Sequence, residues 1–219
     1  MPLTGFSQVW DLIWSDEFDS NYLDQSKWTH EIGTGSQFNM WGWGNGELQY
    51  YQPQNSIVSN GSLKIIAKQE TQALVDSWNN TYYYSSSRIS TKDNFNFKYG
   101  KVEARIKTLD GEGFWPAFWL LPKDGQWPCD GEIDIMEQWG RDIPTDETTG
   151  AAHIGSCANT YSNFKNFQTF SSSNYSSNFH IYSIIWEEDY IAWYVDGNKV
   201  FQVTPASFPT IPNQHSWPF

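Results

Sequence analysis

Short stretches of alternating apolar and polar residues recur along the chain. Over residues 102–107, Val, Ala and Ile alternate with Glu, Arg and Lys, and a period of two predicts a half-buried β-strand. Similar runs rich in β-branched and aromatic residues predict strands over Ser62–Ala67, Lys101–Ile106, Phe179–Trp186, Tyr190–Val195 and Lys199–Val203. Asp196-Gly197-Asn198 is a strong turn signal between the last two strands. Helical periodicity is almost absent, so the pattern predicts an all-β fold.

Two long segments carry no such alternation. Residues Asp76–Ser87 and Ser156–Asn178 are rich in Ser, Asn and Tyr, which predicts long surface loops. Neither an internal repeat nor a linker is visible, and 219 residues are enough for one large domain with a substantial core. We therefore expect a single domain over residues 1–219, built as a two-sheet antiparallel β-sandwich of the jelly-roll kind.

One predicted core strand carries three acidic residues within an apolar hexapeptide, Glu132-Ile133-Asp134-Ile135-Met136-Glu137. Unpaired carboxylates are costly to bury, so their presence needs a reason. Because side chains alternate faces along a strand, Glu132 and Asp134 share one face while Glu137 falls on the other. A β-bulge at about Ile135–Met136 would bring all three acids to one face, and bulges are common beside active sites.

Carboxyl groups paired in this way suit glycoside hydrolysis. A retaining mechanism needs a nucleophile and an acid/base about 5–5.5 Å apart, and an inverting one needs about 6.5–9.5 Å. The charge of Asp134 would raise the pKa of a neighbouring carboxyl group and help it hold a proton near neutral pH. The alternatives are a solvated strand face and three acids that bind a metal. Ion pairing is disfavoured because Lys and Arg are absent between Asp124 and Trp139.

The hexapeptide resembles the catalytic signature of glycoside hydrolase family 16 in its bulged form. Four further segments resemble the family's opening strand, its N-x-E-L-Q-x-Y segment, its W-P-A-x-W segment and its penultimate hairpin, and they follow in the family's order: Trp10–Phe18, Trp41–Tyr51, Gly113–Pro122 and Phe179–Val195. The bulged signature together with the W-P-A-x-W segment is most similar to the laminarinase-like endo-1,3-β-glucanases. The resemblance implies a concanavalin-like jelly roll with a concave substrate cleft.

The resemblance also implies roles for individual residues. It makes Glu132 the nucleophile, Asp134 the assisting acid and Glu137 the general acid/base. It implies substrate binding by residues on both sides of the cleft, namely Asn45, Glu47, Arg88, Trp115, Trp119 and His153. Weaker stacking candidates are Trp41, Trp43, Trp127 and Trp139. Core packing is the alternative for the tryptophans, a surface ion pair for Arg88 and a structural hydrogen bond for His153.

Composition and charge limit the classes of molecule that the protein is expected to bind. Aromatic residues make up 18% of the chain, and they suit sugar faces as well as β-sandwich cores. A net charge of −12 argues against a nucleic-acid partner and favours a neutral β-glucan polysaccharide or oligosaccharide over an acidic one. No apolar run approaches the about 20 residues that span a bilayer. Since Met1-Pro2-Leu3-Thr4 leads directly into the domain, we expect the mature form of a secreted, monomeric protein.

Cys129 and Cys157 are the only cysteines. If the strand around Asp134 pairs antiparallel with the strand around His153, both thiols lie near one end of that hairpin and could form a disulfide, as in an oxidising compartment. The alternative is two independent thiols. No Cys/His spacing fits zinc, so no cofactor is expected to be required. The resemblance implies a structural Ca²⁺ with oxygen ligands near Glu17 and Gly61, although a third ligand of the family has no counterpart.

The sequence therefore predicts an extracellular, retaining endo-β-1,3-glucanase with a covalent glycosyl-enzyme intermediate on Glu132. Mixed-linkage β-1,3-1,4-glucan is a second substrate, and lichenase or agarase specificity is an alternative on the same fold. A non-catalytic β-glucan-binding module is the alternative from another class, and it would predict substituted glutamates. The family's late core strand, an L-N-L-A-V-G-G-like segment, has no counterpart before Phe219, so the domain is expected to lack the family's C-terminal strands.

Overall fold

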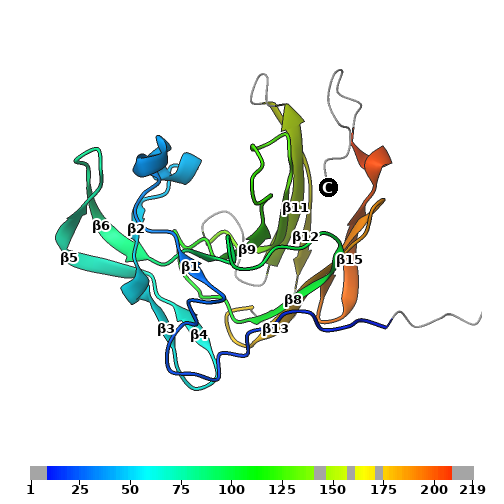
Figure 1. The fold of residues 1–219 in the computed structure, drawn as a ribbon, viewed down its shortest axis with the longest axis horizontal. Helices are drawn as coiled ribbons and strands as arrows, with labels where there is room; N and C mark the ends of the chain where they lie inside the picture. The colour runs from blue at the N-terminus through cyan, green and yellow to red at the C-terminus, as the bar shows by residue number, and fades with distance from the viewer. Residues whose placement is uncertain (1–8, 141–146, 157–160, 171–174, 209–219) are drawn as a thin grey trace, which may run out of the picture. The chain divides into compact units, whose positions relative to one another are not determined.

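The structure is a computed structural model that describes residues 9–140, 147–156, 161–170 and 175–208, with backbone alone for 156 and 161–170. The chain divides into an N-terminal unit, Met1–Phe97, and a C-terminal unit, Lys98–Phe219. Within the described ranges, the regular structure consists of β-strands and short 3-10 helices (Figure 1). In that part of the chain no helix has the length and apolar character needed to cross a bilayer.

The N-terminal unit contains small sheets. Its three-stranded sheet has the order β2-β6-β5, in which β2 and β6 run parallel and β6 and β5 antiparallel. Antiparallel pairs join β3 to β4 and β1 to β7. The strands are β1 (Thr29–His30), β2 (Gln49–Tyr51), β3 (Ser56–Val58), β4 (Leu63–Ile65), β5 (Lys68–Val75), β6 (Thr81–Ser86) and β7 (Ile89–Ser90). The 3-10 helices are η1 (Ser36–Phe38), η2 (Trp41–Gly44) and η3 (Pro53–Asn55).

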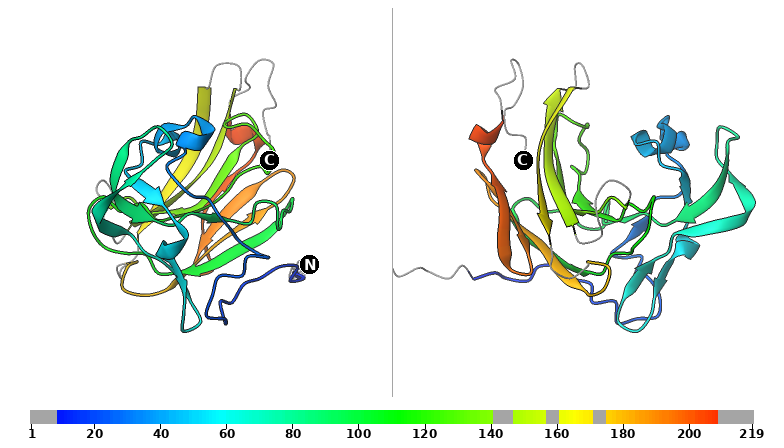
Figure 2. Two further views of the ribbon diagram at one scale, coloured as in Figure 1. Left: turned by 60° about the vertical axis from the view of Figure 1, so that its left-hand side comes forward. Right: turned by 180° about the vertical axis from the view of Figure 1, so that it is seen from behind.

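The C-terminal unit is an antiparallel sandwich of two four-stranded sheets, β12-β11-β10-β9 and β15-β14-β13-β8 (Figures 1 and 2). Its strands are β8 (Gly100–Ile106), β9 (Ala117–Leu120), β10 (Glu132–Glu137), β11 (Glu147–Ser156), β12 (Tyr161–Phe170), β13 (His180–Trp186), β14 (Ile191–Val195) and β15 (Asn198–Val203), followed by the 3-10 helix η4 (Pro205–Ser207). The two layers confirm the predicted all-β sandwich. The single domain over residues 1–219 and the concave cleft stay predictions.

The core of the C-terminal unit lies between these two sheets. Ile133, Ile135 and Met136 of β10 pack in the same buried cluster as Ile184 of β13 and Trp193 of β14. The Trp193 side chain is completely buried, and its Nε1 donates a hydrogen bond of 2.8 Å to the backbone oxygen of Asp134. One sheet thereby holds β10 of the other sheet by both apolar contacts and a hydrogen bond.

The five strands predicted from alternation are all confirmed within two residues at each end, as β4, β8, β13, β14 and β15. Exposure alternates along β8 as its sequence predicts. The turn between β14 and β15 places Asp196 and Gly197 at φ values of 50° and 76°. Two consecutive positive φ angles are the mark of the type I′ turn that matches the twist of a hairpin.

The two predicted surface loops are wrong in part. Asp76–Ser87 contains β6, and Ser156–Asn178 contains β12. Both segments form backbone hydrogen bonds with neighbouring strands: β6 lies between β2 and β5, and β12 pairs with β11 along all ten of its residues. Tyrosine favours strands, and strand formation depends on cross-strand neighbours that a local count of Ser and Asn does not register.

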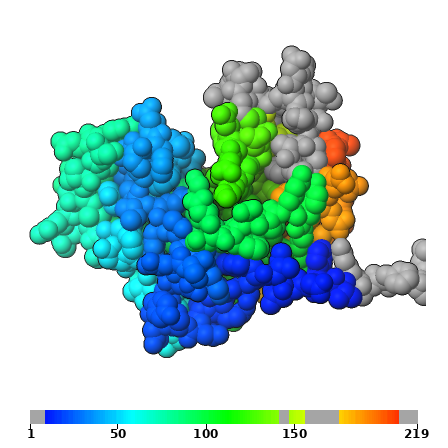
Figure 3. All heavy atoms as spheres, viewed as in Figure 1, coloured from blue at the N-terminus to red at the C-terminus, as the bar shows by residue number. Residues whose placement is uncertain are grey.

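The expected opening strand over Trp10–Phe18 is also wrong, since the structure shows no strand in that segment. Trp14 instead packs its ring against Trp28 and Phe95, with ring centroids 5.4 and 5.5 Å apart. Trp10, Leu12 and Ile13 are exposed, and the segment that contains them lies in the dark blue part of Figure 3. A strand requires a partner for its backbone groups, and no described strand pairs with these residues.

Candidate active site

Strand β10 carries the predicted bulge. Glu132 pairs with His153 and Asp134 with Ala151 on β11, but the register shifts before Glu137, which pairs with Thr149. The register with β9 shifts in the same interval, between Asp134 and Met136. The extra residue allows β10 to place apolar side chains on the face toward the core and all three acids on the other face.

The burial pattern agrees with that assignment of faces. Ile133, Ile135 and Met136 belong to the core cluster and are at most 2% exposed. Ile135 and Met136 are consecutive residues that both point into the core, which is possible only where the alternation is interrupted. Glu132 and Glu137 are half-buried on the opposite face.

Each of the three acids accepts a hydrogen bond from a different ring. Trp127 Nε1 donates to Glu132 Oε2 at 2.6 Å, and Trp115 Nε1 donates to Glu137 Oε1 at 2.9 Å. His153 Nε2 lies 2.9 Å from Asp134 Oδ2. The two tryptophans hold the carboxylates in defined orientations, so both have a positioning role that the sequence did not reveal. The sequence does not show which residue accepts the hydrogen bond of a tryptophan N–H.

Burial raises the pKa of Glu137 to about 7, and the negative charge of Asp134 adds to that effect. The hydrogen bond from Trp115 works in the opposite direction because it favours the ionised carboxylate. The sequence predicted the effect of Asp134 correctly but missed burial as the larger cause. A carboxyl group that keeps its proton near neutral pH is suited to act as a general acid.

Opposing effects act on the pKa of His153. Burial disfavours its imidazolium form, but the hydrogen bond to Asp134 and the charges of Asp134, Glu132 and Glu137 outweigh burial and raise the pKa of the histidine. The hydrogen bond to Asp134 therefore favours the protonated form of the imidazole on the neighbouring strand. Its position beside Glu132 on β11 agrees with the predicted place near the catalytic strand.

The pH profile of hydrolysis should report the loss of the proton from Glu137. Because the protonated form is required to protonate a leaving group, kcat/KM is expected to fall as pH rises through about 7. Trp115→Phe removes the donor that stabilises the ionised form, so the falling limb should move to higher pH. Initial rates across pH on a soluble glucan measure both profiles. An unmoved limb in the variant would contradict the link between Trp115 and the proton of Glu137.

The two tryptophans predicted to stack on sugar lie in different settings. The Trp115 ring stacks on Trp139, with centroids 4.3 Å apart, while its nitrogen engages Glu137. Trp119 lies directly across from Asp134 in the β9–β10 ladder and so shares its face. Both residues are beside the acids as predicted. Their contact with a sugar stays a prediction.

Trp127→Phe should test the donor to Glu132 by keeping an aromatic ring and removing its N–H. A hydrogen bond to a charged group is worth about 1.5–3 kcal/mol, and partial exposure of the ring places the loss near the lower end. We expect kcat/KM to fall by about tenfold. Trp78→Phe, an exposed tryptophan of the N-terminal unit, is the matched control. Wild-type kinetics in Trp127→Phe would show that the bond does not matter.

In the N-terminal unit, Glu47 forms the centre of a polar network. Its carboxylate accepts hydrogen bonds from Tyr51 at 2.6 Å, Gln49 at 2.8 Å and Asn45 at 3.1 Å. Burial, with the charge of Glu47, raises the pKa of Tyr51, so the phenol remains a donor. Gly42 has φ +52°, and a Cβ there would lie 2.5 Å from the backbone nitrogen of Glu47. Only glycine permits this close turn.

Arg88 is held by two neighbours. Its Nε pairs with Glu31 Oε2, and its guanidinium lies over the Trp43 ring, 4.4 Å from the centroid. Trp43 is buried, which favours a structural role for that weaker stacking candidate. The ion pair named as the alternative for Arg88 is therefore present, although an ion-paired guanidinium still has further donors. The sequence did not point to Glu31, which lies 57 residues away.

The structure thus brings together six of the predicted residues in the C-terminal unit, namely Glu132, Asp134, Glu137, Trp115, Trp119 and His153. The other three predicted residues belong to the N-terminal unit, namely Asn45, Glu47 and Arg88. Asn45 and Glu47 contact each other there. Sequence reasoning missed Gln49 and Tyr51 as partners of Glu47, although both stand in the N-x-E-L-Q-x-Y segment.

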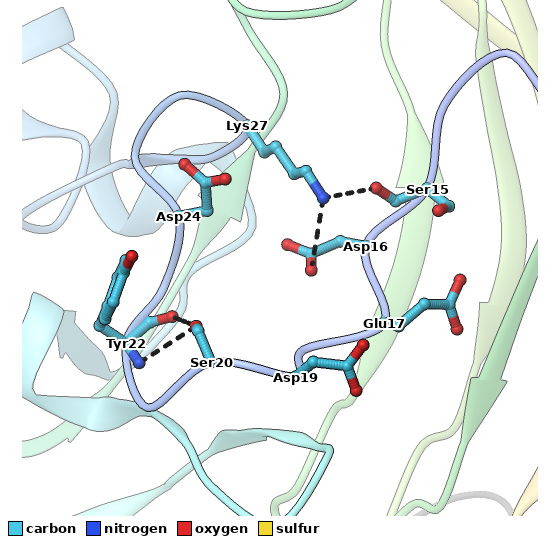
Figure 4. Close-up of a pocket in the computed structure, with 8 residues that line it drawn as sticks. All are labelled: Ser15, Asp16, Glu17, Asp19, Ser20, Tyr22, Asp24 and Lys27. Atoms are coloured by element: carbon cyan, nitrogen blue, oxygen red, sulfur yellow. Dashed lines mark hydrogen bonds and ion pairs between the residues drawn. The ribbon is translucent and has the colours of Figure 1, made fainter.

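The surroundings of Glu17 do not favour the implied calcium site. Glu17 lines a cavity of about 240 Å³ together with Ser15, Asp16, Asp19, Ser20, Tyr22, Asp24 and Lys27. Gly61, the other expected ligand, is not among the lining residues. The ammonium group of Lys27 reaches between Asp16 and Ser15 (Figure 4), 3.6 Å from Asp16 Oδ1 and 2.7 Å from the Ser15 carbonyl oxygen. A fixed positive charge there competes with any cation.

The predicted disulfide involves a residue outside the described part of the chain, Cys157. The strand pairing on which it depends is confirmed, since β10 and β11 run antiparallel with Glu132 opposite His153. Cys129 precedes β10 by three residues and Cys157 directly follows β11. The disulfide stays a prediction.

Comparison with known proteins agrees with this arrangement. Glucan endo-1,3-beta-glucosidase A1 of Niallia circulans is 41% identical over 225 residues, covering 95% of this chain and 32% of that protein. The beta-glucanase of Rhodothermus marinus is 34% identical over 224 residues, covering 96% of this chain and 71% of that protein.

A solved structure shows the same fold. The laminarinase catalytic domain of Thermotoga maritima, in complex with cetyltrimethylammonium bromide, matches with a TM-score of 0.81 and 40% sequence identity, covering 91% of this chain and 79% of that chain. Residues 47–217 match the family described as Glycosyl hydrolases family 16. That range includes β10, the bulge and all three acids, and the chain therefore belongs to glycosyl hydrolases family 16.

Proposed function

We propose that this chain acts as a retaining endo-β-1,3-glucanase on neutral, laminarin-type β-glucans, with mixed-linkage β-1,3-1,4-glucan as a second substrate. The observation that carries the proposal is the bulged strand β10, which presents Glu132 and Glu137 on one face in different environments. Glu137 holds a proton to about pH 7 because it is buried beside Asp134. Two carboxyl groups with separate protonation states supply the nucleophile and the acid that the reaction needs.

In this mechanism Glu132 attacks the anomeric carbon and forms a covalent glycosyl-enzyme, while Glu137 donates its proton to the leaving oxygen. Glu137, now ionised, then removes a proton from water, and the water releases the sugar from Glu132. Trp127 orients the nucleophile and Trp115 orients the acid/base through their indole N–H groups. Asp134, paired with His153, supplies the negative charge that supports the proton on Glu137.

The names of the relatives support the substrate class. The Niallia protein is named a glucan endo-1,3-beta-glucosidase, and the Thermotoga structure is called a laminarinase. We assign neutral β-glucan polysaccharides or oligosaccharides to this chain by that likeness and by its net charge of −12, which disfavours acidic glycans. The chain retains both glutamates, whereas a non-catalytic glucan-binding module has no need of them.

A reducing-sugar assay on laminarin, lichenan, agarose and xyloglucan tests the activity and its specificity. We expect the highest rate on laminarin and a lower rate on lichenan. A highest rate on agarose or xyloglucan would replace the substrate assignment but keep the reaction. Binding to laminarin without release of reducing ends would favour the non-catalytic module and overturn the proposal.

The stereochemistry of the first product tests the covalent route. NMR of the newly formed reducing end, recorded before mutarotation, should show the β-anomer because two successive displacements retain configuration. An initial α-anomer would show a single displacement by water and would remove Glu132 from the nucleophile role.

We also propose that the protein is secreted and monomeric, and that Cys129 and Cys157 form a disulfide. The antiparallel pairing of β10 with β11 supports the bridge, since it directs both cysteines to one end of a hairpin. Mass spectrometry of a non-reduced peptide digest should identify one peptide pair that contains both cysteines. Two separately alkylated cysteines in protein isolated without reductant would contradict the bridge and weaken the case for an oxidising compartment.

A further inference from the structure

Three side chains at strand β10 and its neighbour β11 take part in the proposed hydrolysis, and together they also form a set of potential metal ligands. Glu132, Asp134 and His153 each offer one ligand atom, and these atoms all lie within 4.8 Å of one another. His153 stands 19 residues from Asp134 in sequence. Strand pairing creates the set, which is why the spacing of Cys and His in the sequence did not indicate it.

The backbone of two neighbouring strands fixes the three positions. Glu132 and His153 are direct partners in the β10–β11 ladder, and Asp134 follows two residues along β10 on the same face. His153 Nε2 and Asp134 Oδ2 already approach to 2.9 Å. Ligand atoms around a tetrahedral Zn²⁺, bound at about 2.0–2.2 Å, are separated by about 3.3 Å. The spacing of the three ligand atoms, at most 4.8 Å, is therefore close to the spacing that zinc requires.

Two hydrogen bonds from tryptophans support this set of side chains. Trp127 Nε1 donates a hydrogen bond of 2.6 Å to Glu132 Oε2. This neutral donor orients the carboxylate of Glu132. Trp193 donates to the backbone oxygen of Asp134 from the opposite sheet and holds the strand in place. Outer contacts of this kind are what make a metal ligand set rigid enough to bind.

The chemistry of the three donors selects the type of ion. Two carboxylates and one imidazole suit borderline ions such as Zn²⁺, whereas Ca²⁺ and Mg²⁺ prefer sites made of oxygen alone. The stretch from Asp124 to Trp139 contains five acidic residues and neither Lys nor Arg, so the local sequence supplies no competing cation. Three protein ligands leave a coordination position for water.

We propose that Zn²⁺ binds reversibly to Glu132, Asp134 and His153 and switches off hydrolysis. The ion engages the carboxylate that would otherwise attack the anomeric carbon, and it places a positive charge where the sugar must develop one. The inhibitory effect rests on the proposed function, but the binding itself does not.

Isothermal titration calorimetry with ZnCl₂ tests the site in the absence of any substrate. We expect one equivalent of Zn²⁺ to bind the wild type, MgCl₂ to give no comparable heat, and His153→Ala to weaken the affinity by at least about tenfold. His30→Ala, in the N-terminal unit, is the matched control and should bind as the wild type does. An affinity that His153→Ala leaves unchanged, or a wild type that binds no zinc, would overturn the proposal.

Two further readouts keep the proposal testable if His153→Ala fails to fold. The imidazole signals of His153 in NMR spectra of the wild type should shift on addition of ZnCl₂, while those of His30 should not. Laminarin hydrolysis should be lost at zinc concentrations that match the calorimetric affinity and return on addition of EDTA. If the wild type hydrolyses no glucan, calorimetry and NMR still decide the metal site; hydrolysis that persists with the site saturated would overturn the switch.

Discussion

Replacing Glu132 with Gln is expected to lower kcat on laminarin by about 10⁴-fold or more, the scale seen when an enzyme loses its covalent nucleophile. Glutamine keeps the shape of the side chain and an oxygen that can accept the N–H of Trp127, so the fold of β10 should persist. What the amide lacks is the negative charge that attacks the anomeric carbon. Initial rates of reducing-end release measure the loss, and KM should change far less than kcat.

The matched control is Glu103→Gln on β8. Glu103 is an exposed residue that pairs with Lys101 at 2.5 Å, and an exposed pair of this kind contributes little to stability. Its variant should hydrolyse laminarin at the rate of the wild type. Undiminished hydrolysis by Glu132→Gln would show that another group attacks the sugar, while equal losses in both variants would point to damage to the fold.

Replacing Trp193 with Ala is expected to lower the free energy of unfolding by about 3–5 kcal/mol, the usual cost of truncating a large buried aromatic residue. The side chain is fully buried between the two sheets of the C-terminal unit. The substitution also leaves the backbone oxygen of Asp134 without the indole donor. Urea denaturation followed by circular dichroism measures the loss as a lower midpoint.

A second variant separates packing from hydrogen bonding. Trp193→Phe keeps most of the apolar volume and removes the donor, so it should cost less than Trp193→Ala. Trp78→Ala, which truncates a tryptophan that is 43% exposed, should change stability by no more than about 0.5 kcal/mol. If Trp193→Ala were as stable as Trp78→Ala, the buried ring could not be holding the two sheets together.

The elements predicted correctly are those whose signal is local. The alternation in β8 and the Asp-Gly turn before β15 specify structure within a few residues, and both are present. The bulge in β10 was predictable because two inward-facing residues in a row, Ile135 and Met136, conflict with a flat strand that also carries Glu137. Such a conflict in phase is visible in the sequence alone.

The features that sequence reasoning missed depend on cross-strand partners and on packing. Strand β6 forms between two other strands, and β12 forms against β11, although their composition is typical of loops. The donors Trp115 and Trp127 could not be assigned to their glutamates before the backbone was known. Burial, the main cause of the raised pKa of Glu137, is likewise a property of the packed sheet and not of the hexapeptide.

The six residues of β10 have a consequence for how proteins with this strand can diversify. Because Glu132 and Glu137 stand on one continuous strand, the spacing of the two carboxyl groups depends on the local backbone and its single extra residue. The predicted sugar-binding residues Asn45, Glu47 and Arg88 belong to the other unit. Under the proposed mechanism, changes in these residues would alter the preferred glucan, whereas the anomeric configuration of the product would depend on β10 alone.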